Sequence, residues 1–253
     1  IFTGAIPQFE QPNSEWIEVD ATKHIFRSRN PIASYYAVSA LSRVKFTGLD
    51  EDGYGLIPYQ DYADFSSDNQ LYYEDVTQPL YVGPGVIYNP LGDGSLYVRL
   101  QPPDNIQVFG VTPRATDPNS RSLRIFAIED ALYLRNLAYV EFENFAVENF
   151  GGVKVLGGAT PDHHMTFTDM RLSLATIGAV NVDPPAHDVL FERLHLKGGF
   201  PAWIYRSDIK NGYPTSAPAG SLHVGLMSIS TDINYPLSQR VRVTGSIFEG
   251  SFF

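Results

Sequence analysis

The chain has 253 residues, a formal net charge of −10 and no cysteine. The lack of cysteine excludes disulfides and thiolate metal sites, and 18 Lys and Arg against 28 Asp and Glu argue against nucleic acid as the main partner. The sequence holds no run of 18 apolar residues, so we expect no membrane span.

Residues 1–79 are rich in aromatic side chains and show no regular period. WIEVD at 16–20 and HIFRS at 24–28 are typical of strands. The acidic, Tyr-rich segment 50–75 is expected to loop out from this β-rich portion. We expect an irregular β-rich N-terminal portion packed on the coils that follow, with a small separate domain as the alternative. The chain starts at Ile1 without a signal peptide, so we expect a mature or cut piece of a longer polypeptide.

A hairpin is predicted at about 85–100, the start of a second part that spans 80–253. GVIYN and SLYVRL are β-prone runs, and PLGDG between them supplies turn residues. Residues 101–120 read as loop because they contain QPPDN and TPRATDPNS. SLRIFAIEDALYL at 122–134 is predicted to be an early, less regular coil.

From residue 139 onward the sequence repeats a pattern of apolar positions. YVEFENFAV, HMTFTDMRL, DVLFERLHL and RVRVTGSIF start at Tyr139, His164, Asp188 and Arg240, at offsets of 25, 24 and 52 residues. Apolar and polar residues alternate, then slip by one at Asn144, Asp169, Arg193 and Gly245. Alternation indicates a strand, and the slip indicates a bend between two short strands.

A third apolar piece follows each pair: GGVKVL at 151–156, IGAVNV at 177–182 and GGFPAWIY at 198–205. Three short strands in a coil of about 24 residues are typical of a parallel β-helix, whereas helical repeats need an i, i+3, i+4 pattern. A β-sandwich with chance matches is the alternative. Residues 208–239 break the period as an insertion, within which LHVGLMSIS has the pattern of a strand.

The segments VEFENFAVENFGGVKVLGG, HMTFTDMRL and VLFERLHLKGGFPAWIYRSD resemble coils of the right-handed parallel β-helix proteins of the pectate-lyase-like superfamily. LYVGPGVIYNPLGDGSLYVRLQPPD resembles the hairpin that many large secreted members carry before their coils. The resemblance implies an all-β, right-handed single-stranded β-helix in a secreted or cell-surface protein. It implies no single activity, because the group includes lyases, hydrolases and non-enzymes.

Outward positions in successive coils stack at about 4.8 Å, so alignment estimates distance. Glu143 and Glu192 are two rungs apart, roughly 10 Å, slightly more than an inverting glycosidase pair requires. Asp169 falls beside Arg193, either as a catalytic group or as a cross-strand ion pair. His164 falls above Asp188, where the carboxylate either orients a general base or merely stacks on the surface.

Metal-ligating residue types gather at the same corner, but no H-x-x-x-H or EF-hand spacing accompanies them. They are Asp162, His163, His164, His187 and Asp188. The sequence therefore predicts no metal site and no cofactor, with calcium as an option if the protein is a lyase.

FPAWIYRSDIKNGY at 200–213 interleaves aromatic and charged residues at the start of the insertion. Trp203, Tyr205 and Tyr213 have the composition of a sugar platform, although the rings equally suit a core edge. A lyase base would come from Arg206 or Lys210, and a hydrolase pair from Asp169, Asp208 and Glu192. P-loop, dinucleotide and serine-hydrolase motifs are absent from the sequence.

The leading hypothesis is a secreted β-helix protein that binds and cleaves polysaccharide, with Glu143 and His164 joining the aromatic residues in substrate binding. The competing class is a non-catalytic extracellular scaffold, such as an adhesin, a tailspike-like module or a surface-assembly module. The chain stops at EGSFF in the middle of a coil, so we expect a further segment or another subunit to cover the last coil.

Overall fold

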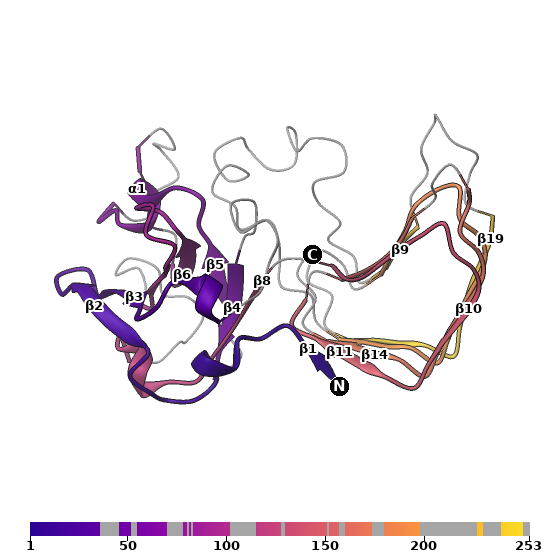
Figure 1. Cartoon of the computed structure of the whole chain (residues 1–253), viewed down its shortest axis with the longest axis horizontal. Helices are drawn as coiled ribbons and strands as arrows, with labels where there is room; N and C mark the ends of the chain where they lie inside the picture. The colour runs from indigo at the N-terminus through magenta and orange to yellow at the C-terminus, as the bar shows by residue number, and fades with distance from the viewer. Residues whose placement is uncertain are drawn as a thin grey trace. The chain divides into compact units, whose positions relative to one another are not determined.

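The structure is a computed structural model, and it describes residues 1–35, 46–51, 55–69, 78–79, 81, 83–101, 115–127, 130–150, 152–156, 160–173, 180–197, 227–229 and 239–249. The chain divides into two compact units (Figure 1). Among the described residues, one unit comprises residues 5–127. The other combines residues 1–4 with the described residues from 130 to 249.

The unit of residues 5–127 is built on a seven-stranded sheet with the order β2-β3-β7-β6-β5-β4-β8. Its strands are β2 (Trp16–Asp20), β3 (Ile25–Ser28), β4 (Phe46–Asp50), β5 (Gly55–Pro58), β6 (Gly85–Tyr88), β7 (Leu96–Arg99) and β8 (Leu123–Ala127). Short helices accompany them: η1 (Pro7–Phe9), η2 (Ile32–Ser34), α1 (Tyr62–Phe65) and η4 (Pro118–Ser120). The strands expected within 16–28 are confirmed as β2 and β3, which pair antiparallel.

The predicted hairpin is confirmed as β6 and β7, with Val86 opposite Val98. Its turn forms because Asn89 adopts the left-handed region with φ 49° and accepts a hydrogen bond from the Gly94 amide at 2.6 Å. β7 also pairs with β3, so the hairpin lies within the same sheet as strands from the first 60 residues. Apolar residues from both faces of this sheet form two buried clusters.

Residues 122–134 do not form a single coil, so that prediction is wrong. β8 pairs antiparallel with β4 in the seven-stranded sheet, whereas β9 (Asp130–Arg135) pairs in parallel with β12 (Gly152–Leu156) in the other unit. Both halves alternate as strands do. Alternation predicts which face of a strand is buried and does not identify its partner.

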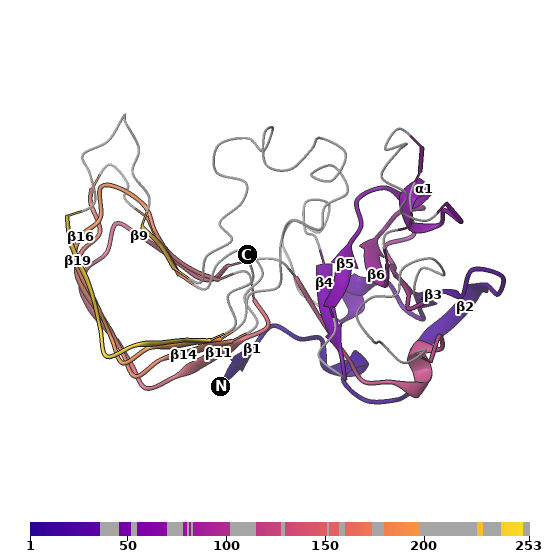
Figure 2. The ribbon, with the colours of Figure 1, turned by 180° about the vertical axis from the view of Figure 1, so that it is seen from behind.

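The second unit is a parallel β-solenoid made of three sheets. The first sheet stacks β10 (Ala138–Glu143), β13 (His163–Thr168), β16 (His187–Glu192) and β19 (Gln239–Thr244). The second stacks β1 (Phe2–Thr3), β11 (Ala146–Glu148), β14 (Arg171–Ser173), β17 (His195–Lys197) and β20 (Ile247–Glu249). The third stacks β9, β12, β15 (Val180–Val182) and β18 (Met227–Ile229). Figures 1 and 2 look along the stack, so the strands of each sheet overlie one another.

The predicted register of the repeat is confirmed throughout the first two sheets. Val140, Met165, Val189 and Val241 occupy one row, and the next inward row runs from Phe142 to Val243. Beyond the bend, Val147 aligns with Leu172, Leu196 and Phe248. The offset of 52 residues is therefore one coil that carries an insertion.

The third strands of the first two repeats are confirmed as β12 and β15. The third expected piece, at 198–205, lies outside the described residues. On the side away from β12, β15 pairs with β18, which lies in the LHVGLMSIS segment and places Met227 opposite Val180. Residues 198–226 thus separate β17 from β18 within this coil.

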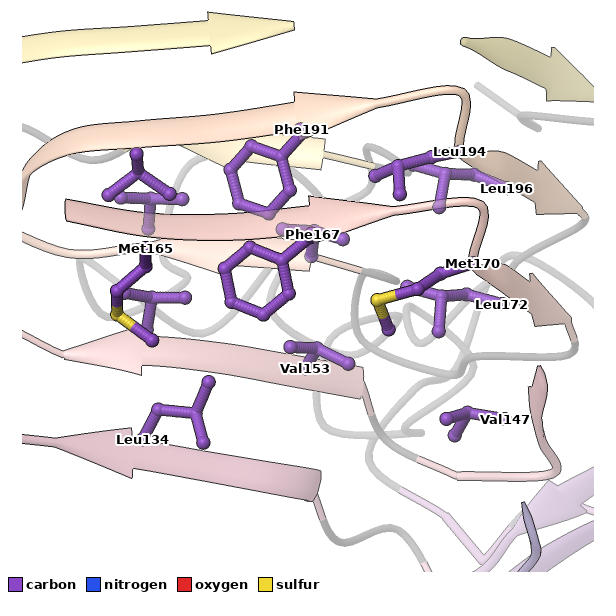
Figure 3. Packing of buried hydrophobic residues seen from close by; sticks show 14 of the residues in the cluster. Leu134, Val147, Val153, Met165, Phe167, Met170, Leu172, Phe191, Leu194 and Leu196 are labelled. Carbon is purple, nitrogen blue, oxygen red and sulfur yellow. The ribbon is translucent and has the colours of Figure 1, made fainter. Parts of the chain in front are cut away.

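The inward rows build a continuous core inside the solenoid (Figure 3). Phe142 stacks on Phe167 with a ring-centroid distance of 5.0 Å, and Phe167 stacks on Phe191 at 4.8 Å. Met165 and Leu196 are fully buried. Equal residue types can stack in this way because parallel strands in register hold equivalent side chains one rung apart.

The first residues of the chain add a rung to the second sheet. β1 pairs in parallel with β11, and the Gly4 amide then donates to the carbonyl of Glu148 at 3.1 Å. A Cβ at Gly4 would lie 2.4 Å from the carbonyl oxygen of Asn149, so this close approach requires glycine.

Candidate functional site

Two columns of residues with positive φ run up the solenoid, one within the strands of the first sheet and one at the bend that follows them. One column holds Tyr139, His164, Asp188 and Arg240, with φ from 52° to 58°. The other holds Asn144, Asp169, Arg193 and Gly245, with φ from 53° to 60°. L-residues visit this left-handed region rarely, and repeated use of it turns equivalent side chains outward one above another. The candidate residues therefore owe their alignment to the backbone.

Asp169 and Arg193 form a two-fold hydrogen-bonded ion pair. Arg193 Nε donates to Asp169 Oδ1 at 2.7 Å, and Nη2 donates to Oδ2 at 2.8 Å. Arg193 Nη1 also lies 3.0 Å from Glu192 Oε1. These hydrogen bonds from Arg193 lower the pKa of Asp169 and raise the pKa of Arg193. The predicted ion pair between Asp169 and Arg193 is confirmed, and Glu192 contacts the same guanidinium.

Asp188 forms a similar pair one column away. Arg240 donates from Nε to Oδ1 and from Nη2 to Oδ2, the latter at 2.6 Å. His187 Nδ1 lies 2.8 Å from Asp188 Oδ2. The hydrogen bonds from Arg240, and then from His187, hold the pKa of Asp188 well below its ordinary range.

The proposed orientation of His164 by Asp188 is not a hydrogen bond in the structure. His164 Nε2 lies 4.0 Å from Asp188 Oδ2, beyond hydrogen-bonding distance. His164 Nδ1 instead lies 2.9 Å from His163 Nδ1. The ring of Tyr139 stacks on His164 with centroids 4.8 Å apart, and the Tyr139 side chain is exposed.

Neither aspartate has the properties of a general acid. A carboxyl group that protonates a leaving group needs a raised pKa, whereas both carboxylates are stabilised in the charged form by guanidinium groups. Glu143 and Glu192 align through Thr168, as predicted, and their strands are two rungs apart. That spacing of roughly 10 Å places the two glutamates on one outward row.

The remaining candidates lie outside the described residues. They are the proposed base and acid residues Arg206, Asp208 and Lys210, and the proposed aromatic platform Trp203, Tyr205 and Tyr213. Among the described candidates, Asp169 and Glu192 both contact Arg193, and His164 lies 4.0 Å from Asp188.

Two interacting residues were missed by reasoning from the sequence. The offset of 52 residues aligned Arg240 with Asp188, but the ion pair between them was not predicted. Arg99 in the other unit is 4% exposed, donates to the carbonyls of Phe65 and Ser67 at 3.1 and 2.8 Å, and lies 3.8 Å over the ring of Tyr81. Alternation in β7 predicted which side of the sheet Arg99 faces, but it did not predict these partners.

Comparison with known proteins adds no relative. No family model matches the chain, and neither the curated proteins nor the solved structures contain a significant match. Among the described residues, no helix has both the length and the apolar character needed to cross a membrane.

Proposed function

We propose that the solenoid binds polysaccharide along its outer surface, as a secreted or cell-surface protein. The observation that carries this proposal is the first outward column. Tyr139 is 77% exposed and its ring is held by His164, while Asp188 and Arg240 follow in the same column. A flat ring offers contact to the apolar face of a sugar, and the charged groups offer hydrogen bonds to its hydroxyl groups.

Cleavage of the bound polysaccharide is the second part of the proposal, by a lyase or a glycoside hydrolase of the pectate-lyase-like kind. The low pKa values of Asp169 and Asp188 do not suit a general acid. The other catalytic candidates from the sequence are Glu192, Arg206, Asp208 and Lys210, of which the last three lie outside the described residues. Calcium would accompany these residues only in a lyase.

The binding proposal is tested with a matched pair of tyrosine variants. Tyr139→Asn removes the exposed ring and keeps a residue that tolerates the left-handed backbone. Tyr133→Asn removes a ring that is 60% exposed on β9, in a different sheet. Loss of one aromatic contact worth about 1 kcal/mol weakens binding about fivefold.

Affinity electrophoresis against a panel of neutral and uronic polysaccharides measures this difference. We expect retardation by at least one polysaccharide, weakened by Tyr139→Asn and unchanged by Tyr133→Asn. Equal loss in both variants would contradict the assignment to this column. Reducing ends and the absorbance of unsaturated products, measured on the same mixtures, report cleavage.

A non-catalytic scaffold is the second candidate, and one observation favours it. Ile247 and Phe248 of β20 are 56% and 48% exposed, and Phe248 aligns with the fully buried Leu196 of the preceding coil. Apolar residues at a strand edge invite another chain or segment. Self-association in sedimentation experiments, without retention by any polysaccharide, would support the scaffold over the binding proposal.

A further inference from the structure

One corner of the solenoid gathers two imidazoles and a carboxylate from neighbouring rungs. His164 comes from β13, and His187 and Asp188 come from β16. Each offers one ligand atom, and the three atoms lie within 4.8 Å of one another. We propose that His164, His187 and Asp188 bind a first-row transition-metal cation, with Zn²⁺ as the representative ion.

The spacing of the three atoms needs small side-chain rotations to suit a tetrahedral ion. With bonds of about 2.0–2.1 Å, neighbouring ligand atoms on Zn²⁺ are roughly 3.3 Å apart. His187 Nδ1 lies 2.8 Å from Asp188 Oδ2 and must move outward, whereas His164 Nε2 lies 4.0 Å from the same oxygen and must move inward. The parallel ladder fixes the two strands, so the adjustment falls on χ angles alone.

Neighbouring rings already orient His164 for this role. Its Nδ1 lies 2.9 Å from His163 Nδ1, so one of these two nitrogens donates a hydrogen to the other. When His164 Nδ1 is the donor, the lone pair is on Nε2, the nitrogen that faces Asp188. Metal-binding histidines are commonly oriented through the second ring nitrogen in this way. Tyr139 packs on one face of the His164 ring and limits its rotation.

The site is open to solvent and keeps its carboxylate available. The side chains of His164, His187 and Asp188 are 49%, 29% and 23% exposed. Arg240 donates to both oxygens of Asp188. Each carboxylate oxygen has two lone pairs, so Oδ2 can accept Arg240 and also bind an ion once His187 carries its hydrogen on Nε2 and no longer donates from Nδ1 to Oδ2. The guanidinium competes electrostatically with the cation, and we therefore expect Arg240→Gln to strengthen metal binding.

The set of donors selects the chemical class of the ion. Two imidazoles and one carboxylate suit Zn²⁺, Ni²⁺, Cu²⁺ and Co²⁺, whereas Ca²⁺ and Mg²⁺ prefer oxygen ligands throughout. Three protein ligands leave a fourth tetrahedral position for water or another group. The H-x-x-x-H spacing of helical metal sites is unnecessary here, because the parallel ladder brings His164 close to His187 as one helical turn would do in a helix.

Titration of tag-free, chelator-treated protein with Zn²⁺ in a calorimeter tests the site, and visible absorbance of the Co²⁺ form reports its coordination. The ligand variants are His164→Asn, His187→Gln and Asp188→Asn, of which the first and third keep residues that tolerate positive φ. Matched controls are His195→Gln, whose imidazole faces Glu249 in the second sheet, and Asp169→Asn, whose carboxylate sits in the corresponding Arg pair.

We expect one equivalent of Zn²⁺, with affinity reduced roughly tenfold or more by each ligand variant and unchanged by the controls. Circular dichroism must show that the variants stay folded. The proposal would be overturned if neither Zn²⁺ nor Co²⁺ bound or if Ca²⁺ were preferred. It would also be overturned if a variant that combines all three ligand substitutions bound Zn²⁺ as tightly as the wild type. Zn²⁺ binding and polysaccharide binding are measured separately: retardation of the chelator-treated protein tests the latter, so either can fail alone.

Discussion

Asp169 and Arg193 show how single residues at the bends of the solenoid tie adjacent coils together. Both adopt the left-handed region, which costs an L-residue of order 1–3 kcal/mol. The same backbone places their side chains one rung apart, where two parallel hydrogen bonds form. Gly245 occupies the equivalent position in the next coil without this conformational cost. These bends therefore combine an unfavourable backbone with favourable contacts between coils.

The ion pair predicts a pH dependence of stability. Arg193 lowers the pKa of Asp169 below its ordinary value of 3.8, so the folded state holds the proton less tightly than the unfolded state. The contribution of Asp169 is then present at pH values well above the unfolded pKa of 3.8 and is lost as the pH falls through 3.8 toward the folded pKa. Asp169→Asn lacks this titrating group and keeps a residue that tolerates positive φ.

Urea unfolding of the wild type and Asp169→Asn between pH 7 and pH 3 checks this. We expect the wild type to be more stable at pH 7 and the difference to shrink below pH 4. In an Arg193→Gln background, Asp169→Asn should give no such pH-dependent difference. A constant difference at all pH values would show that the pair does not couple to the titration.

At the scale of elements, the solenoid strands were predictable and the partners of the strands before them were not. The spacing of Phe142, Phe167 and Phe191 predicted both their inward orientation and their alignment, because coils of equal length bring equivalent residues into register. β8 and β9 alternate in the same manner and belong to different sheets. Their partners are set by distant segments, which no local pattern specifies.

The phenylalanine stack provides a test of the core at this scale. Phe167 is 1% exposed and lies between two other rings, so Phe167→Ala loses buried area and leaves a cavity. We expect the free energy of unfolding to fall by about 3–5 kcal/mol. Phe2→Ala makes the same change at a ring that is 64% exposed and should cost less than about 1 kcal/mol. Chemical denaturation measures both, and similar losses would contradict the proposed core.

At the scale of the whole molecule, the described residues form separate hydrophobic cores. The solenoid cluster contains Phe167 and Leu196, while the clusters of residues 5–127 contain Leu96 and Phe65. Cooperative units of this kind open independently when their cores are separate.

Hydrogen exchange measured by mass spectrometry tests this independence. We expect Phe167→Ala to accelerate amide exchange in the solenoid strands β10, β13 and β16 and to leave β2, β3 and β7 protected. Leu96→Ala, at a fully buried position in β7, should have the opposite pattern. Each substitution is expected to cost about 2–5 kcal/mol in its own unit. Acceleration across the whole chain by either variant would show that the two units unfold together.

The sequence by itself determined that residues 139–249 coil as a solenoid, which of their side chains face inward and which outward residues align. Coil length and alternation suffice for this, because a parallel ladder converts equal spacing into proximity. Only the tertiary structure decided that Arg240 binds Asp188, that His164 lies beyond hydrogen-bonding distance of Asp188, and which atoms of His164, His187 and Asp188 approach one another. Those contacts depend on side-chain rotamers, which alternation and coil length leave open.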